Sequence, residues 1–148
     1  FFKGMQKYFT DPKIAYGFAH TSDFQRNMEA VSGLDLNYFF NQWFYGQGYP
    51  TFTVYWSQNA NNNVQIYVKQ TTSHPSVSFF KVPLEIVFQN GSQEKRITID
   101  INQKMQQTAV NIGFQATKVL VDPDMQIISK GNTTVKLGAN ADTAPGFE

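Results

Sequence analysis

Apolar residues recur at helical spacing through the first third of the chain. In residues 1–10 they lie three or four positions apart, which predicts the final turns of a helix that ends at Asp11-Pro12. A second helix is expected in "TSDFQRNMEAVSG". There Ser22 is the expected N-cap, Gln25 completes a capping box, and Gly33 takes the left-handed conformation after the last turn.

A third helix is expected in "LDLNYFFNQWFYG", with Asp35 as its N-cap and Gly46 as its end. Its apolar residues fall on one face at i, i+3, i+4, i+7 and i+8: Leu36, Phe39, Phe40, Trp43 and Phe44. The second and third helices are both short and have strongly apolar faces. Because neither would be stable alone, both must pack against something else.

After Pro50 the apolar period changes from helical spacing to two, which is typical of strands. Phe52, Val54 and Trp56 are expected on one face of the first strand, and Asn90-Gly91 is a strong hairpin signal. About seven short strands with turn residues between them predict an antiparallel, immunoglobulin-like β-sandwich. The expected strands lie around 51–56, 64–68, 82–88, 96–101, 108–114, 118–122 and 125–129.

The expected fold class is therefore α+β, with two to three short helices followed by the sandwich. We place the helical segment at 1–48, the sandwich at 49–130 and a partly disordered tail at 131–148, where the sequence becomes polar and loses its period. The chain opens inside a helical pattern, which suggests that it is part of a longer protein.

Composition narrows the function classes. The formal net charge is +1, with 12 basic and 11 acidic residues and no basic run, so nucleic-acid binding is not expected. No apolar run is long enough to span a membrane. The absence of cysteine excludes disulfides and thiolate metal sites. The 12 Asn and 14 Gln favour a bacterial periplasmic or secreted location.

Candidate catalytic chemistry is sparse. His20 and His74 lie in no zinc-binding pattern and are interpreted as loop residues. Asp122-Pro123-Asp124 follows a β run, so turn formation is favoured over catalysis or calcium binding. The serines lie in no nucleophile motif. We therefore expect neither a catalytic residue nor a metal ligand in this chain.

Aromatic residues of the first two strands leave two interpretations open. Trp56 shares a face with Phe52 and Val54, so core packing is favoured for it. Tyr55 and Tyr67 point to the other face. They could pack, or they could form a surface that binds glycan or protein by stacking.

The stretch "GFAHTSDFQRNMEAVSGLDLNYFFNQWFYGQGYPTFTV" resembles the aminopeptidase N-like zinc metallopeptidases (gluzincins), at the last helices of their catalytic domain and the first strand of the following β-sandwich. "SFFKVPLEI" and "KVLVDPD" are similar to that sandwich further along. The likeness covers about residues 1–130 and is most specific at 18–56. The matching positions are Asp23-Phe24, Ser32-Gly33, Asp35-Leu36, Phe39-Phe40, Trp43, Gly46, Gly48 and Pro50.

The resemblance implies a C-terminal, non-catalytic portion of such a peptidase. In the family the zinc-binding H-E-x-x-H motif and the other catalytic residues precede this region, so zinc is implied for the parent protein and no cofactor for this chain. The implied partners are the remainder of the catalytic domain and, for the parent, peptide substrates. Four aromatic side chains (Phe39, Phe40, Trp43, Phe44) would pack where the two domains join, and Gly46, Gly48 and Pro50 would make the turn between them.

The alternative is a free-standing, immunoglobulin-like binding module for glycan or protein, which would use Tyr55, Tyr67 and the loops. Two helices with apolar faces argue against it, because such a module does not need them. A coding sequence with H-E-x-x-H before Phe1 would favour the peptidase portion. Specific ligand binding by this chain alone would favour the module.

Overall fold

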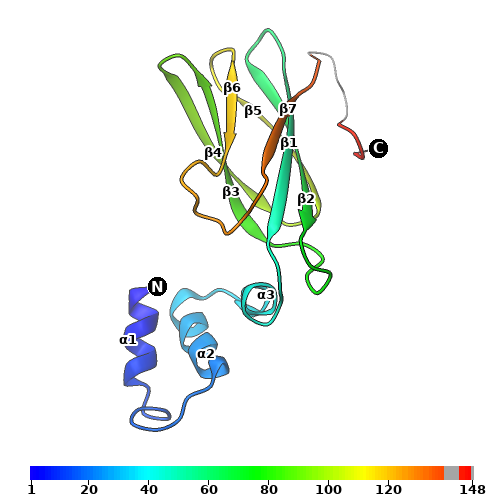
Figure 1. The fold of residues 1–148 in the computed structure, drawn as a ribbon. Helices are drawn as coiled ribbons and strands as arrows, with labels where there is room; N and C mark the ends of the chain where they lie inside the picture. Colours follow the sequence, from blue (N-terminus) through cyan, green and yellow to red (C-terminus); the bar gives the residue numbers. More distant parts are fainter. Residues whose placement is uncertain (139–143, 148) are drawn as a thin grey trace. The chain divides into compact units, whose positions relative to one another are not determined.

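The computed structural model describes residues 1–138 and 144–147. The fold is α+β, with the helices first and two β-sheets after them (Figure 1). The chain divides into two compact units, Phe1–Gly46 and Gln47–Glu148. We call them the helical unit and the β unit. Of the tail expected at 131–148, residues 139–143 and 148 lie outside the described part.

The helical unit is built on two helices that lie side by side, α1 (Phe2–Thr10) and α2 (Thr21–Ser32) (Figure 1). They come close because Gly4 is buried against Met28, where a Cβ atom on Gly4 would collide with the Met28 side chain. One turn further, the rings of Tyr8 and Phe24 meet edge to face at 5.3 Å between centroids. The end of the first helix at Asp11-Pro12 is confirmed.

The start of α2 differs from the expectation, whereas its end agrees. His20, not Ser22, is the N-cap, and the side chain that reaches back to it is that of Asp23, not Gln25. Asp23 Oδ2 accepts the backbone N–H of His20 at 2.9 Å. Asp23 is the third residue of the helix, which therefore begins at Thr21, two residues earlier than expected. Gly33 has φ 70° and donates its N–H to the Glu29 carbonyl, which confirms the expected left-handed cap.

The third helix is not a regular α-helix. A single turn, α3 (Asn37–Phe39), continues as a π-helix, η1 (Phe40–Phe44), in which Tyr45 N–H bonds the Phe40 carbonyl at 2.8 Å. Leu36 occupies the cap position, although the Asp35 carboxylate accepts the Asn37 N–H at 2.8 Å, as expected of a capping residue. The wider turn rotates the aromatic side chains away from the single stripe that regular helical spacing predicts.

The β unit contains two sheets whose arrangement is consistent with a β-sandwich (Figure 1). One has the strand order β5-β2-β1-β7 and the other β4-β3-β6. All pairings are antiparallel except β1 with β7, which is parallel. The strands are β1 (Pro50–Gln58), β2 (Asn63–Thr72), β3 (Val82–Asn90), β4 (Gln93–Ile101), β5 (Met105–Asn111), β6 (Lys118–Val121) and β7 (Thr133–Lys136).

The core of the β unit lies between the sheets and follows the alternation in the sequence. Phe52 and Val54 are fully buried and Trp56 nearly so, as expected for one face of the first strand. The Trp56 ring meets Phe88 of β3 edge to face, with centroids 6.1 Å apart. The hairpin at Asn90-Gly91 is also confirmed, since β3 and β4 pair up to Asn90 and Gln93.

The last strand lies elsewhere than expected. Residues 125–129 form no strand, because Asp122 and Met125 have φ values of 45° and 51° and the Asp122 carboxylate accepts the N–H groups of Gln126 and Ile127. The expected turn at Asp122-Pro123-Asp124 is thereby confirmed. The seventh strand is β7, beyond residue 130 where the sandwich was expected to end. Its exposed, mostly polar sequence has no alternation to reveal it.

Candidate functional site

The aromatic residues expected to pack between domains lie in the helical unit with very different exposures. Phe40 is buried at 4%, Trp43 is half-buried, and Phe39 and Phe44 are 46% and 58% exposed. Phe40 lies at the centre of this group, and its ring meets Phe24, Phe39 and Phe44 edge to face. These rings are thus only partly used inside the helical unit and present open faces.

The open faces line two hollows in the helical unit. The larger, of about 610 Å³, is almost wholly apolar and has no acidic residue in its wall. Phe1 and Phe2 at its edge are 80% and 84% exposed. Its lining residues are Phe1, Phe2, Lys3, Gly4, Phe24, Met28, Val31, Ser32, Leu34, Leu36, Phe39 and Phe40. A hollow of this character suits apolar side chains better than a polar substrate.

The second hollow, of about 450 Å³, shares Phe24, Phe39 and Phe40 with the first. Its remaining wall is Tyr8, Ala19, His20, Thr21, Trp43 and Phe44. His20 is the only histidine in this wall, and its backbone serves as the N-cap of α2. The wall contains no carboxylate or second histidine, so the hollow lacks an acid–base pair.

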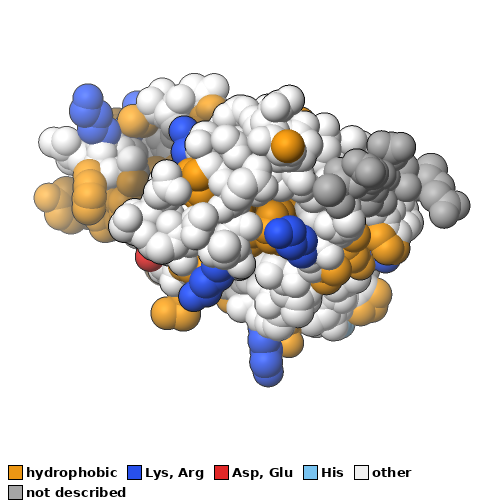
Figure 2. All heavy atoms as spheres, turned by 90° about the horizontal axis from the view of Figure 1, so that it is seen from above, with side chains coloured by type: hydrophobic (Ala, Val, Ile, Leu, Met, Phe, Trp, Pro, Cys, Tyr) orange, Lys and Arg blue, Asp and Glu red, His pale blue; other side chains and the backbone are white. Residues whose placement is uncertain are grey.

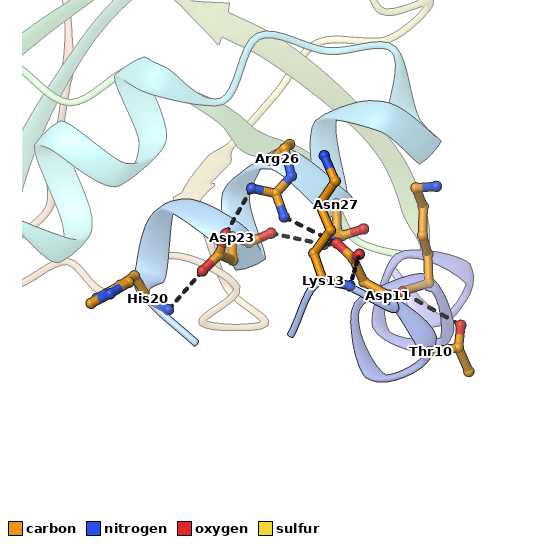
Figure 3. Close-up of polar contacts among 8 residues, drawn as sticks. Thr10, Asp11, Lys13, His20, Asp23, Arg26 and Asn27 are labelled. Carbon is orange, nitrogen blue, oxygen red and sulfur yellow. Dashed lines mark hydrogen bonds and ion pairs between the residues drawn. The ribbon is translucent and has the colours of Figure 1, made fainter. Parts of the chain in front are cut away.

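A polar cluster joins the loop after α1 to α2 (Figure 3). Asp11 Oδ2 accepts bonds from Arg26 Nη2 and Asn27 Nδ2, each at 3.0 Å, and Arg26 Nη1 bonds Asp23 Oδ1 at 2.7 Å. The Asn27 amide, then the Lys13 N–H and Arg26, lower the pKa of Asp11 to about 2. Both carboxylates are held ionised by local donors, so this cluster is suited to fixing the loop and not to proton transfer.

Gly48, the second glycine of the expected turn, is held within the β unit by the loop between β2 and β3. Gly48 has φ 94°, and a Cβ there would meet the side chains of Ser73 and His74. Ser73 Oγ accepts the Tyr49 N–H at 2.9 Å, and Ser76 Oγ accepts the Gln47 N–H at 3.0 Å. Glycine is needed at position 48 both for the backbone conformation and for this close approach.

The side chains of His74 and Ser76 contact each other, and this contact has a structural role. His74 Nδ1 lies 2.9 Å from Ser76 Oγ, a distance that a nucleophile and its base would also show. However, the same nitrogen accepts the Ser76 N–H at 3.2 Å, and Ser76 Oγ is engaged with the Gln47 backbone. The pair closes the turn at residues 74–76.

Pro50, the last residue of the turn expected between the helices and the sandwich, begins β1 and is buried.

Tyr55 and Tyr67 are paired across β1 and β2, as a shared surface requires. Tyr55 is half-buried, but Tyr67 is only 2% exposed, and its ring contacts Phe147. Tyr67 is therefore covered in this chain, whereas part of the Tyr55 side chain is open to solvent.

The charged residues of the β unit also act locally. Arg96 bonds Glu85, Glu94 and Asp124, and the side-chain bonds from Gln89 and Arg96 lower the pKa of Glu94. On the face shown in Figure 2, the lysine and arginine side chains stand apart and form no continuous basic patch. Among residues 1–138 and 144–147, no three potential ligand side chains gather into a metal-binding group.

Sequence reasoning missed two buried glutamines, because alternation treats glutamine as a surface residue. Gln58 and Gln70 are 7% and 4% exposed and bind backbone groups of the connections that follow β5 and β2. Only the three-dimensional arrangement reveals them.

None of the helices in the described part of the chain combines the length and apolar character needed to cross a membrane.

Comparison with known proteins adds no family assignment. A scan of the sequence against models of protein families finds no match, and a search among curated proteins finds no matching one.

Proposed function

We propose that this chain is the C-terminal, non-catalytic portion of a zinc-dependent aminopeptidase of the aminopeptidase N-like class. In this proposal the helical unit completes the catalytic domain, and the β unit is the sandwich domain that follows it. The chain itself contributes packing surface and no catalytic group. Peptide substrates and zinc belong to the parent protein.

The observation that carries the proposal is the ordered pattern of residues from Asp23-Phe24 to Pro50. Several of its members have a definite physical role at their positions. Gly33 has the left-handed conformation that ends α2, and Gly48 has φ 94° in a place too tight for a side chain. Phe40 is the buried centre of the aromatic group. A pattern whose members each meet a local requirement is more informative than one of interchangeable residues.

The apolar hollows of the helical unit supply the second support. Helices of nine and twelve residues with large exposed rings need further partners to cover their apolar faces. The 610 Å³ hollow, with Phe2 and Leu34 at its edge, has the chemistry of a contact with other helices. We propose that the remainder of the catalytic domain covers it.

The finer description of the β unit as immunoglobulin-like is part of the same proposal. β1, β2 and β5 lie in one sheet and β3 and β6 in the other, in the order of strands A, B, E and of C, F in that fold. β4 extends the second sheet beside β3, as strand C′ does in variable-type domains. β7 differs, since it pairs in parallel with β1.

The test uses the protein extended to the natural start of its coding sequence, beside the 148-residue chain. Release of N-terminal amino acids from peptides should occur with the long protein, stop with a chelator and return with zinc. The 148-residue chain should be inactive. A folded long protein that contains no H-E-x-x-H motif and releases no amino acids would contradict the proposal.

Coverage of the hollow can be measured separately from activity. The 148-residue chain should bind an apolar fluorescent dye, and Phe2→Ser should reduce this binding because Phe2 lines the hollow. Met125→Ser is the matched control, since Met125 is 85% exposed in a turn of the β unit. The long protein should protect the α1 and α2 amides from hydrogen exchange more strongly than the short chain does. Equal protection would show that nothing covers the helical unit.

A further inference from the structure

Tyr67 is buried on a face of its sheet where burial is not expected. Its neighbours along β2, Ile66 and Val68, are 0% and 1% exposed and belong to the core between the sheets. Because side chains alternate along a strand, Tyr67 points to the opposite, outer face. An outer-face tyrosine is normally open to solvent, yet Tyr67 is only 2% exposed. Something outside the sheet must therefore cover it.

The cover comes from residues 144–147, which we call the C-terminal segment. The Phe147 ring meets the Tyr67 ring edge to face, with 5.2 Å between centroids. Ala144 is 2% exposed, and the Phe147 N–H bonds the Ala144 carbonyl at 3.0 Å, so the segment forms a turn and not an added strand. Figure 1 shows this segment beside the four-stranded sheet.

Gly146 lies close against the sheet within this turn. It has φ 85°, and a Cβ on it would come within 3.0 Å of Met105 Cε and 3.6 Å of Lys69 Nζ. Lys69 and Met105 are paired residues of β2 and β5, two positions along β2 from Tyr67. The segment therefore rests on a small surface made by the Tyr67 ring, the Met105 methyl group and the Lys69 ammonium group.

The chemistry of this surface suits an aromatic side chain. A tyrosine ring offers edge-to-face contacts to another ring, as Tyr67 does to Phe147. Tyr55, the partner of Tyr67 on β1, is half-buried and extends the surface beyond the segment. The surface already holds one such ring, that of Phe147.

We propose that Tyr67, Met105 and Lys69 form a binding site for a peptide with an aromatic side chain, whose ring contacts Tyr67 and whose preceding residue rests on Met105 and Lys69. Gly146 and Phe147 occupy this site as an intramolecular ligand, so an external peptide binds only in competition with the chain's own segment. A tethered ligand has an effective concentration on the order of millimolar, so Phe147 competes with an external peptide of millimolar affinity. This inference does not depend on the proposed peptidase origin.

The test uses the full chain with Phe147→Ala, which empties the site without shortening the protein. The probe is the acetylated, amidated peptide Ala-Pro-Gly-Phe, and the control peptide is Ala-Pro-Gly-Ala. Backbone NMR spectra of ¹⁵N-labelled protein report binding at Tyr67, Lys69 and Met105. Phe18→Ala is the matched protein control, because Phe18 is 97% exposed in the helical unit.

The F147A chain should bind the phenylalanine peptide saturably, with a dissociation constant on the order of millimolar. The unsubstituted chain and F18A should bind it at least about twofold more weakly, because Phe147, tethered at a millimolar effective concentration, competes with a peptide of millimolar affinity. The control peptide should cause no shifts. Unchanged amide shifts at Tyr67 in F147A would show that Phe147 is not the cover. Equal binding of the two peptides, or no binding to F147A, would overturn the site.

Discussion

Asp11 lies where the loop after α1 meets α2, and its carboxylate accepts more hydrogen bonds than an exposed aspartate normally does. Asn27 Nδ2, Arg26 Nη2 and the Lys13 N–H all donate to it. Each bond stabilises the ionised form, so the pKa falls from the ordinary 3.8 to about 2. Asn27 contributes most, and its amide also donates to the Asp23 carbonyl inside α2. A single residue therefore ties the loop to the helix through charge-assisted bonds.

This arrangement predicts an acid-sensitive helical unit. The folded state binds a proton at Asp11 less tightly than the unfolded state, so the stabilisation is fully present above about pH 4. It is lost as the pH falls through the folded-state pKa of about 2. The carboxyl ¹³C shift of Asp11, followed during an acid titration, should give a midpoint near that value.

Substitutions should move this midpoint in a defined order. Asn27→Ala should raise the pKa of Asp11 most, and Arg26→Gln should raise it less, because the Asn27 amide is the stronger cause. Asn37→Ala, a matched change elsewhere in the helical unit, should leave it unchanged. A midpoint near 3.8 in the unsubstituted chain would contradict the bonding described for Asp11.

At the scale of elements, two buried glutamines fix connections between strands. Gln70 at the end of β2 donates to the Phe80 carbonyl at 2.9 Å and accepts the Phe80 N–H at 2.5 Å. Gln58 at the end of β1 binds the connection before β6 in the same way. Its side chain donates to the Phe114 carbonyl and accepts the Ala116 N–H. In both cases one side-chain amide forms hydrogen bonds with two backbone groups.

Gln70→Ala should therefore be strongly destabilising. It removes the hydrogen bonds that the Phe80 N–H and carbonyl make with Gln70, at a cost of about 1–3 kcal/mol for each buried group. The free energy of unfolding from urea titration should fall by about 2–5 kcal/mol. Gln65→Ala, an exposed position on the same strand, should change it by less than about 0.5 kcal/mol. A similar, small effect at both positions would show that Gln70 does not hold the connection.

At the scale of the whole molecule, the two units differ greatly in how much apolar surface they bury internally. Of the buried apolar side chains in the described residues, only Met28 and Phe40 belong to the helical unit. The β unit has a core that includes Phe52, Phe80 and Phe88 at 0% exposure. Burial of this kind is the dominant favourable contribution to folding.

The β unit should consequently be much more stable than the helical unit. Residues 47–148 alone should give a cooperative thermal transition and a dispersed NMR spectrum. Residues 1–46 alone should melt at a lower temperature and less cooperatively, because helices of this length gain little stability by themselves in water. A stable, cooperatively melting 1–46 peptide would argue against the proposed need for covering helices.

Local chemistry and residue periodicity were enough to predict several features of the fold. The α+β order, the end of α1, the Gly33 cap, the alternation of β1 and the Asn90-Gly91 hairpin all follow from neighbouring residues. The concentration of aromatic residues in 39–50 was also evident. These predictions succeed because capping, turn conformation and side-chain alternation act over a few positions.

The remaining features arise only in the folded chain. The parallel pairing of β7 with β1 and the burial of Gln58, Gln70 and Tyr67 depend on partners far along the chain. The regular apolar spacing also gave no sign of the π-helical turn at Phe40–Phe44. The exposed strand β7 shows no alternation of apolar and polar residues. A buried glutamine cannot be told from an exposed one in the sequence. The cover of Tyr67 lies eighty residues away, at Phe147. Such contacts form only when distant segments meet in the folded chain, so no local pattern could reveal them.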